Sequence, residues 1–484
     1  MNRIDLLEIT PDERIRIIGA ADLMLERIPE LVYPEEADAE KRAYAMSVLA
    51  NPLAKAENVA YRRDIARDFL VSGDLLSRVV EDVKGIDELS ALWQEERRQV
   101  IAEWQKTREN SGYTDEANFQ EKISMVQADL RQFLRLYDRL NKLIDTLTVN
   151  TLYADGLLEF KETCIRLYAS YAFSAVPRAR KLLEVDPARY TCELLLGMNE
   201  NLAVDTVELN MLYTPDAEES AANSGAPGTE LNVNVPQMMP LVRAALDNLD
   251  SQTVGSCETL ERLFNDLNAQ LRFYTFCTDF CHALTAAGAN YMFPQMTDAD
   301  SGVTSALELR DVYEVLSHEG AGNSHDVLLT PERSGIIVTG EGGVGKTALL
   351  RAVCTAQILA QCGLPVTCRD ASLAIRTGVF ACFTESFDAS KEPMRRFETE
   401  ARAMAKIIDN LTPHALVALN ELFESTGFAD ASDALYNIFS VISQHDIYFI
   451  ATTHLPRLAE RFIEIDHVTA MSMKAGGKLV RMRS

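Results

Sequence analysis

The sequence lacks any hydrophobic run of membrane-spanning length. Its first ten residues, MNRIDLLEIT, have neither the basic start nor the apolar core of a secretory signal. We therefore expect a cytoplasmic protein without membrane contact.

The nine cysteines are an odd number in a chain of 484 residues, which argues against a disulfide framework. Cys277 and Cys281 lie one helical turn apart and can either begin a metal site or fill a helix face. No second pair follows at a useful spacing, which favours packing.

Basic residues are scarce relative to acidic ones. The chain has 47 Lys and Arg against 72 Asp and Glu, a net charge of −25, of which −18 falls in residues 1–290 and −7 in residues 291–484. A surface of this sign repels polyanions, so contact with nucleic acid requires local basic patches.

Proline and glycine are rare across most of residues 1–210, which favours long helices. Apolar side chains there recur at three- and four-residue spacing, as in Leu130, Leu134, Tyr137, Leu140, Ile144 and Leu147. Residues 191–213 break this pattern and predict a strand–turn–strand element, followed at 214–236 by a loop without Lys or Arg. Beyond residue 291, short strand-like runs alternate with helices. We predict a helical domain at 1–290, with an acidic insertion at about 191–236, and an α/β domain at 291–484.

A glycine-rich motif, GEGGVGKT, follows the buried-strand pattern of residues 336–339 and precedes a helix pattern. This strand–turn–helix setting is that of the phosphate-binding P-loop, whose backbone N–H groups surround the phosphates of a nucleotide. Lys346 is predicted to bridge the β- and γ-phosphates, and the Thr347 hydroxyl to bind Mg²⁺. The predicted nucleotide-binding residues are Gly340, Glu341, Gly342, Gly343, Val344, Gly345, Lys346, Thr347 and Ala348. The alternative is a glycine-rich turn without a ligand.

A second apolar run, at residues 416–419, lies about seventy residues after the P-loop and ends in Asn420 and Glu421. A neighbouring parallel strand would bring its end to the same crevice. Glu421 is then the candidate for activating the attacking water. The Asn420 amide oxygen can accept a hydrogen bond from a magnesium-bound water, but it brings no charge. Alternatively, the two residues only end a strand.

A third strand pattern, IYFIATTH, ends in His454. A histidine at such a position can contact the γ-phosphate or the catalytic water, although an isolated histidine is more often structural. The two preceding strand-end candidates favour the catalytic interpretation.

Together these motifs resemble the ATPase domain of the MutS family of DNA mismatch-repair proteins, a branch of the ABC-type ATPases. The segment AQCGLPVTCRDASLAI resembles that family's A-Q-x-G-x-x-V-P-A segment. RRFETEARAMAKIIDNLTPHALVALNELFEST resembles its signature helix and Walker B strand. LANPLAKAENVAYRRDIARDFL, at residues 49–70, is similar to its helical core segment. The resemblance implies a long-helix core and lever domain followed by an ABC-type P-loop ATPase domain.

Several features depart from the family pattern. No F-x-E wedge motif precedes the core segment, and the acidic insertion lacks the basic residues that a DNA clamp needs. Arg395 and Arg396 replace the signature Ser-Thr, whereas Phe397 and Glu400 remain. Asn-Glu in the Walker B strand and an R-F-E-x-E-A signature resemble a divergent bacterial subgroup that lacks the mismatch-recognition domain.

The resemblance implies a homodimer that binds ATP and Mg²⁺ between its subunits, with signature residues reaching the partner's nucleotide. The candidates for that contact are Arg395, Arg396, Phe397 and Glu400. A solvated helix start is the alternative for the two arginines. The implied function is ATP hydrolysis that moves lever helices acting on DNA in repair or recombination. The alternative is a nucleotide-dependent dimeric interaction module with little hydrolysis and no DNA contact. The sequence leaves open which DNA structure or protein client is acted on.

Overall fold

The computed structural model describes residues 5–111, 115–172, 175–188, 191–198, 204–214, 235–317, 322–383, 393–423, 428–454, 456–463, 467–474 and 476–482. The chain forms two compact units. The first combines residues 1–71 with 272–484, and the second comprises residues 72–271. The boundary between them falls inside the long helix α10 (Val235–Ala286). The chain is thus a mixed α and α/β protein, as predicted.

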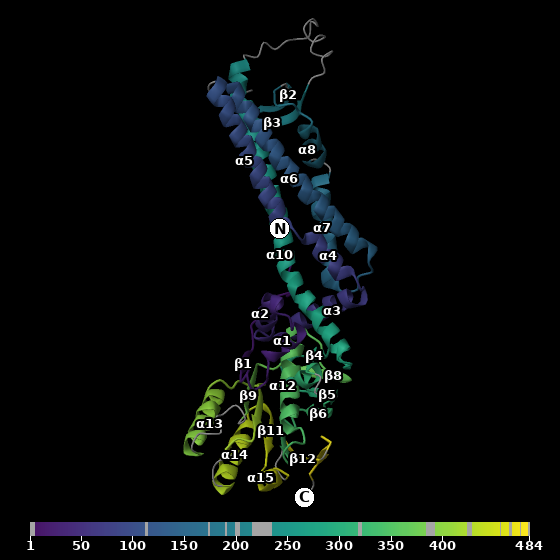
Figure 1. Cartoon of the computed structure of the whole chain (residues 1–484), viewed down its shortest axis with the longest axis vertical. Coiled ribbons are helices and arrows are strands. Elements are labelled where there is room, and N and C mark those ends of the chain that lie inside the picture. Colours follow the sequence, from purple (N-terminus) through teal and green to yellow (C-terminus); the bar gives the residue numbers. More distant parts are fainter. Residues whose placement is uncertain are drawn as a thin grey trace. The chain divides into compact units, whose positions relative to one another are not determined.

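The first unit is built on a seven-stranded sheet in the order β1-β9-β10-β11-β7-β12-β13. Figure 1 labels four of these strands, β1, β9, β11 and β12. Its strands are parallel except for β13, which pairs antiparallel with β12. The strands are β1 (Arg16–Ile18), β7 (Gly335–Thr339), β9 (Gly378–Phe383), β10 (Leu416–Asn420), β11 (Tyr448–Thr453), β12 (Val468–Met473) and β13 (Leu479–Arg481). Strands β7, β9, β10 and β11 are buried at every residue, which explains their continuous apolar runs.

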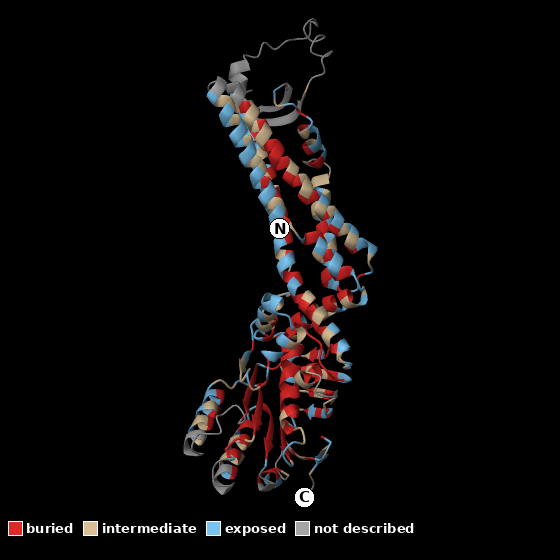
Figure 2. Ribbon diagram, viewed as in Figure 1, coloured by how far each residue is buried: buried red, intermediate tan, exposed pale blue. Residues whose placement is uncertain are grey.

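The core of this unit lies between the sheet and three helices, α13 (Pro393–Ile408), α14 (Phe428–Ile442) and α15 (Pro456–Arg461). Phe380, Val417 and Phe449 point from the strands into this layer. Helix α12 (Lys346–Cys362) contacts β9, β10 and β11 and contributes no residue to that layer. Every residue of α12 except Thr347 is buried, and the strands and α12 are accordingly red in Figure 2. A helix that is enclosed on all sides explains the apolar composition of residues 348–362.

A second sheet of four strands, in the order β4-β8-β5-β6, completes the α/β part of the first unit. Its strands are β4 (Gln295–Thr297), β5 (Thr304–Leu309), β6 (His325–Leu329) and β8 (Asp370–Ala374), and they are accompanied by η2 (Ala299–Ser301) and α11 (Val312–Leu316). This architecture agrees with the α/β texture predicted beyond residue 291.

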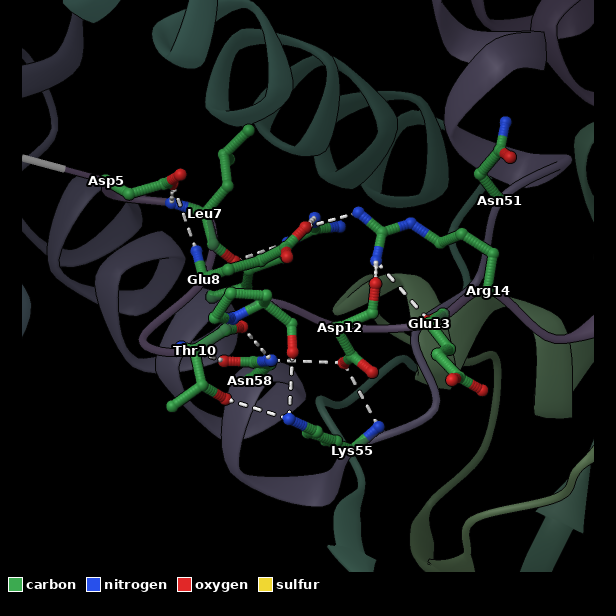
Figure 3. A network of polar contacts seen from close by, with 12 residues as sticks. Asp5, Leu7, Glu8, Thr10, Asp12, Glu13, Arg14, Asn51, Lys55 and Asn58 are labelled. Carbon is green, nitrogen blue, oxygen red and sulfur yellow. Dashed lines mark hydrogen bonds and ion pairs between the residues drawn. The ribbon is translucent and has the colours of Figure 1, made fainter. Parts of the chain in front are cut away.

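The amino-terminal residues belong to the same unit and contribute α1 (Arg27–Val32), η1 (Glu36–Asp38), α2 (Ala39–Leu49) and α3 (Ala56–Val71). Residues 5–14 lie along the start of α3 (Figure 3). Asn58 holds this segment by accepting from the Ile9 N–H (2.8 Å) and donating to the Thr10 carbonyl (2.9 Å). Arg62 donates from Nε to the Leu7 carbonyl at 2.9 Å and from Nη1 to the Cys362 carbonyl, at the end of α12, at 3.4 Å. Polar contacts thus connect the amino terminus to the end of the P-loop helix.

The second unit is predominantly helical. It contains α4 (Leu75–Val83), α5 (Ile86–Ser111), α6 (Asp115–Val149), α7 (Asp155–Ala172), α8 (Ala175–Leu183) and residues 235–271 of α10. Helix α6 contacts α4, α5, α7 and α8, and its predicted apolar stripe is buried at Leu130, Tyr137, Leu140 and Leu147. Strands β2 (Thr191–Met198) and β3 (Val204–Tyr213) pair antiparallel, which confirms the two predicted strands, while residues 199–203 between them lie outside the described residues. The predicted loop at 214–236 lies, apart from residues 214, 235 and 236, outside the described residues.

Two details differ from the sequence interpretation. Residues 16–18 form an edge strand of the large sheet although the surrounding region was expected to be helical, because three residues are too few to show a strand period. The compact units also divide the chain differently from a boundary at residue 290. The two units are separated by which residues contact one another in space. The predicted boundary was placed where the sequence changes from helical patterns to alternating strands and helices. No helix in the described ranges is both long and apolar enough to cross a bilayer.

Candidate nucleotide site

The glycine-rich motif forms the turn between β7 and α12. Gly343 and Gly345 have φ angles of +74° and +101°, a backbone region that side chains with a Cβ rarely adopt. The turn leads directly into the amino terminus of α12, where the first N–H groups of a helix have no intrahelical acceptor and the helix dipole favours anions. Residues 340–348 therefore have the geometry that a phosphate group requires.

Lys346 is the first residue of α12, and its side chain is almost fully buried. Its Nζ donates to the carbonyl oxygens of Gly340 and Glu341, both at 2.9 Å, and lies 3.6 Å from Oε1 of Glu421. The lysine charge is thus held over the glycine-rich turn and beside the strand-end carboxylate.

Strand β10, which carries Asn420, is not the direct neighbour of β7 that the sequence interpretation expected. Strand β11 lies between them and is parallel to both. The expectation was wrong because strand order cannot be read from chain order when crossovers skip a position. The registers nevertheless align the strand ends, since Asn420 pairs with Thr452 and Thr452 with Val338.

Asn420 is fully buried at the end of β10. Its Oδ1 accepts from the Thr452 hydroxyl at 2.6 Å and faces the Thr347 hydroxyl at 3.5 Å. The structure therefore brings together the two residues that were predicted to contact Mg²⁺ directly or through water. Hydroxyl and amide oxygens suit Mg²⁺, which keeps several waters in its shell.

Glu421 follows β10 in the left-handed backbone region, with a φ angle of +53°. Its Oε1 lies 2.6 Å from Nε2 of His454, which directly follows β11. Glu421, His454 and Lys346 thus form one charged cluster, and both the glutamate and the histidine side chains are partly exposed. A carboxylate oriented by a histidine beside a phosphate-binding turn has the composition of a general-base site.

The predicted signature residues lie on α13. The side chains of Arg395 and Arg396 are outside the described residues, so their role stays a prediction. Phe397 packs against Phe423, with ring centroids 5.2 Å apart, and the buried Glu400 accepts from the Phe423 N–H at 2.7 Å. Within one chain, these two side chains contact the turn after β10. A contact of theirs with a partner's nucleotide stays a prediction as well.

Two residues near the site were missed from the sequence. Thr452 orients the Asn420 amide, and its position in ATTH was the available signal. Asn323 donates from Nδ2 to the Val344 carbonyl in the turn at 3.4 Å, a contact that no spacing predicts. Cys277 and Cys281 are both buried in α10, and the described residues contain no cluster of three or more metal-binding side chains.

The parallel sheet, the strand–glycine-rich turn–helix and the polar strand ends place this part of the chain among the P-loop-type α/β domains. Residues 336–482 match the family model of MutS domain V, which is the ATPase domain of that family. Residues 336–482 therefore belong to the MutS family of ATPase domains.

The relatives match only in part. Endonuclease MutS2 of Streptococcus gordonii is 29% identical over 174 residues, 35% of this chain and 22% of its own. DNA mismatch repair protein msh-2 of Neurospora crassa is 27% identical over 221 residues, 44% of this chain and 23% of its own. DNA mismatch repair protein MSH4 of Arabidopsis thaliana is 25% identical over 182 residues, 37% of this chain and 22% of its own. The chain therefore spans less than a quarter of the length of these relatives.

Proposed function

We propose that this protein is an ATP-dependent MutS-like DNA-repair or recombination protein that binds and hydrolyses ATP. The observation that carries the proposal is the cluster of Glu421, His454 and Lys346, with Oε1 of Glu421 at 2.6 Å from His454 and 3.6 Å from Lys346. The cluster lies beside a glycine-rich turn at a helix amino terminus. Residues 340–348 hold the phosphates, and Glu421 accepts a proton from the attacking water.

Thr347 and Asn420 are the proposed magnesium contacts, Asn420 through a water molecule. Bound Mg²⁺ offsets the negative charge on the phosphate oxygens. The Thr452 hydroxyl donates to Oδ1 of Asn420 at 2.6 Å, and the same oxygen faces the Thr347 hydroxyl at 3.5 Å. His454 holds the Glu421 carboxylate in place.

The decisive experiment compares Mg²⁺-dependent ATP turnover in the wild type, Glu421→Gln and Lys346→Ala. Glu421→Gln should lose turnover by about 100-fold or more while it still binds ATP, because an amide cannot accept the proton. Lys346→Ala should lose ATP binding itself. Equal turnover in the wild type and Glu421→Gln would show that hydrolysis is not carried at this site.

A homodimer and an action on DNA through moving lever helices in residues 72–271 are the further parts of the proposal. Both rest on the similarity to the MutS family, and the net charge of −25 works against the DNA part. Binding to homoduplex, mismatched and branched DNA at low and moderate salt, with and without ATP, tests the DNA part. Failure to bind any of these at low salt contradicts it, because electrostatic attraction is greatest there.

The alternative is a nucleotide-dependent dimeric interaction module with little hydrolysis and no direct DNA binding. The neutral Asn420 beside Thr347 favours it, since an amide contributes no charge to the magnesium site. Two results together identify this module. Analytical ultracentrifugation shows that the protein dimerises when ATP is added, and Glu421→Gln has the same ATP turnover as the wild type.

A further inference from the structure

Glu400 is a carboxylate on the apolar face of its helix. Helix α13 contributes Met404 and Ile407 to the hydrophobic layer under the sheet, and Phe397 and Ala401 pack against it. Glu400 lies on the same face and is 0% exposed. An ionised carboxylate in such a place costs several kcal/mol unless it is hydrogen-bonded or paired. Its Oε2 accepts from the backbone N–H of Phe423 at 2.7 Å.

Phe423, which donates to Glu400, belongs to a strained turn at residues 421–423. Glu421 and Phe423 have φ angles of +53° and +63°, which costs each of them on the order of 1–2 kcal/mol in a residue with a Cβ. Such a conformation persists only where its surroundings impose it. Strand β11 holds one side, because the Glu421 N–H donates to the Thr452 carbonyl at 3.1 Å. Helix α13 holds the other through Glu400 and through Phe397 against Phe423.

The neighbouring strand end has a comparable arrangement. Asp22 Oδ2 accepts from the N–H of Phe383, the last residue of β9, at 3.1 Å. Strand β9 contributes none of the three clustered side chains Lys346, Glu421 and His454, whereas β10 leads directly into Glu421. The contact of Glu400 therefore bears on the orientation of Glu421.

We propose that Glu400 is a positioning residue for ATP hydrolysis, which sets the turn at residues 421–423 and thereby directs the Glu421 carboxylate toward the phosphate-binding turn. This inference rests on the proposed role of Glu421. A displacement of α13 breaks the contact between Glu400 and Phe423 and relaxes the turn. Hydrolysis, but not ATP binding, is thereby coupled to the position of the helix that carries Arg395 and Arg396.

The test compares Glu400→Gln, whose amide oxygen can still accept from the Phe423 N–H, with Glu400→Met, which has similar length and no strong acceptor. ATP turnover and the Kd for ATP are measured for both. Glu400→Met should lower kcat by about 10-fold or more with the Kd within about 2-fold of the wild type. Glu400→Gln should restore kcat to within about 3-fold. Amide hydrogen exchange at residues 421–423 should rise in Glu400→Met and stay low in Glu400→Gln.

Glu398 provides a matched control, because it is exposed on the same helix. Glu398→Met should leave kcat, Kd and exchange at residues 421–423 unchanged. Wild-type turnover in Glu400→Met, together with an inactive Glu421→Gln, overturns the positioning role and leaves the proposed function intact. Wild-type turnover in Glu421→Gln overturns both. If Glu400→Met does not fold, Phe397→Leu decides, because it weakens the other contact of α13 with Phe423, and an unchanged kcat there contradicts the coupling of hydrolysis to α13.

Discussion

At the residue scale, Asn420 is the proposed magnesium contact that brings no charge. Its amide is fully buried, accepts from the Thr452 hydroxyl and faces Thr347. A carboxylate of the same size would bring a full charge to the place where Mg²⁺ is proposed to lie. It would also be a buried charge whenever the metal is absent, and such a charge is destabilising. If the proposed magnesium contact is correct, the amide lowers magnesium affinity and stabilises the metal-free site.

We predict that Asn420→Asp reduces the magnesium concentration needed for half-maximal ATP turnover by several-fold. In EDTA the variant should unfold about 1–3 kcal/mol more easily than the wild type, and Mg²⁺ with ATP should restore much of that difference. Magnesium titrations of turnover and thermal unfolding with and without EDTA measure the two effects. An unchanged magnesium dependence would show that Asn420 lies outside the magnesium shell.

At the scale of elements, the P-loop helix is fixed at its far end by a buried amide. Gln361 Nε2 donates to the carbonyls of Leu53 (2.7 Å) and Arg376 (3.1 Å), while its Oε1 accepts from the Arg376 N–H (3.0 Å) and from Gln357 (2.7 Å). The Leu53 N–H in turn donates to the Gln361 carbonyl at 2.9 Å. One side chain therefore joins α12 to the amino-terminal segment and to the residues that follow β8.

Gln361→Leu should lower the free energy of unfolding of the first unit by about 2–4 kcal/mol, because it leaves several buried polar groups without their partner. Chemical denaturation followed by loss of ATP binding measures the change. Gln105→Leu, an exposed glutamine on α5, is the control and should shift stability by less than about 0.5 kcal/mol. If Gln361→Leu lowered the free energy of unfolding by no more than Gln105→Leu does, water would have replaced the hydrogen bonds of the Gln361 amide.

A second element-scale feature lies among the helices of the second unit. Asp129 on α6 is fully buried, and its Oδ1 accepts from Trp93 Nε1 (2.7 Å) and Arg97 Nη1 (2.6 Å). Burial and a hydrogen bond to Asp250 raise the pKa of Asp129 to about 7, although Trp93 and Arg97 lower it. The pKa of Asp250 is itself lowered, since its bonds to Asp129 and Lys122 outweigh its burial. Of the two carboxyl groups, Asp129 is therefore the one whose pKa is raised, to about 7.

This pair makes the stability of α5, α6 and α10 depend on pH. An unfolded Asp has a pKa near 3.9, so between about pH 4 and 7 the folded state holds a proton that the unfolded state lacks. The free energy of unfolding therefore falls as pH rises through this window and levels off above about pH 7. Asp129→Asn should remove this slope, because an amide does not titrate.

Urea unfolding followed by tryptophan fluorescence measures the effect in the second unit alone, because both tryptophans, Trp93 and Trp104, lie on α5. Asp145→Asn, exposed on α6, is the control and should keep the wild-type slope. A slope that persists in Asp129→Asn would assign the titration to another group.

At the scale of the whole molecule, the local patterns predicted the elements well and their association less well. The strand–turn–helix at residues 335–362 and the strand ends at Asn420 and His454 were readable, because buried strands and glycine-rich turns leave local signals. The insertion of β11 between β7 and β10, the contact of Glu400 with Phe423 and the edge strand β1 were not. Each of these depends on contacts between residues distant in sequence.

The pairing of the edge strand β1 with β9 leads to a prediction about which residues are needed for the first unit to fold. A fragment of residues 291–484 contains every predicted ATP contact but lacks β1, which pairs with β9, and Arg62, which donates to the Cys362 carbonyl at 3.4 Å. It also lacks Leu53, the partner of Gln361. The first unit combines residues 1–71 with residues 272–484, and the fragment contains only part of the second segment. Because such a fragment uncovers the parts of the buried helix α12 that contact α2 and α3, we expect it to be unfolded and unable to bind ATP.

Supplying residues 1–71 together with residues 272–484 should restore a folded first unit, because these two segments contain all of its elements. Circular dichroism and ATP binding are measured for the fragment 291–484 alone, for 272–484 alone and for 272–484 co-expressed with 1–71. We expect cooperative unfolding and ATP binding only in the last case.

The control is the same co-expression with Asn58→Ala in the fragment of residues 1–71, since Asn58 holds residues 9 and 10 on α3. It should bind ATP with reduced stability. ATP binding by residues 291–484 alone would show that the nucleotide domain folds without the amino terminus, and that the boundary at residue 290 is the physical one.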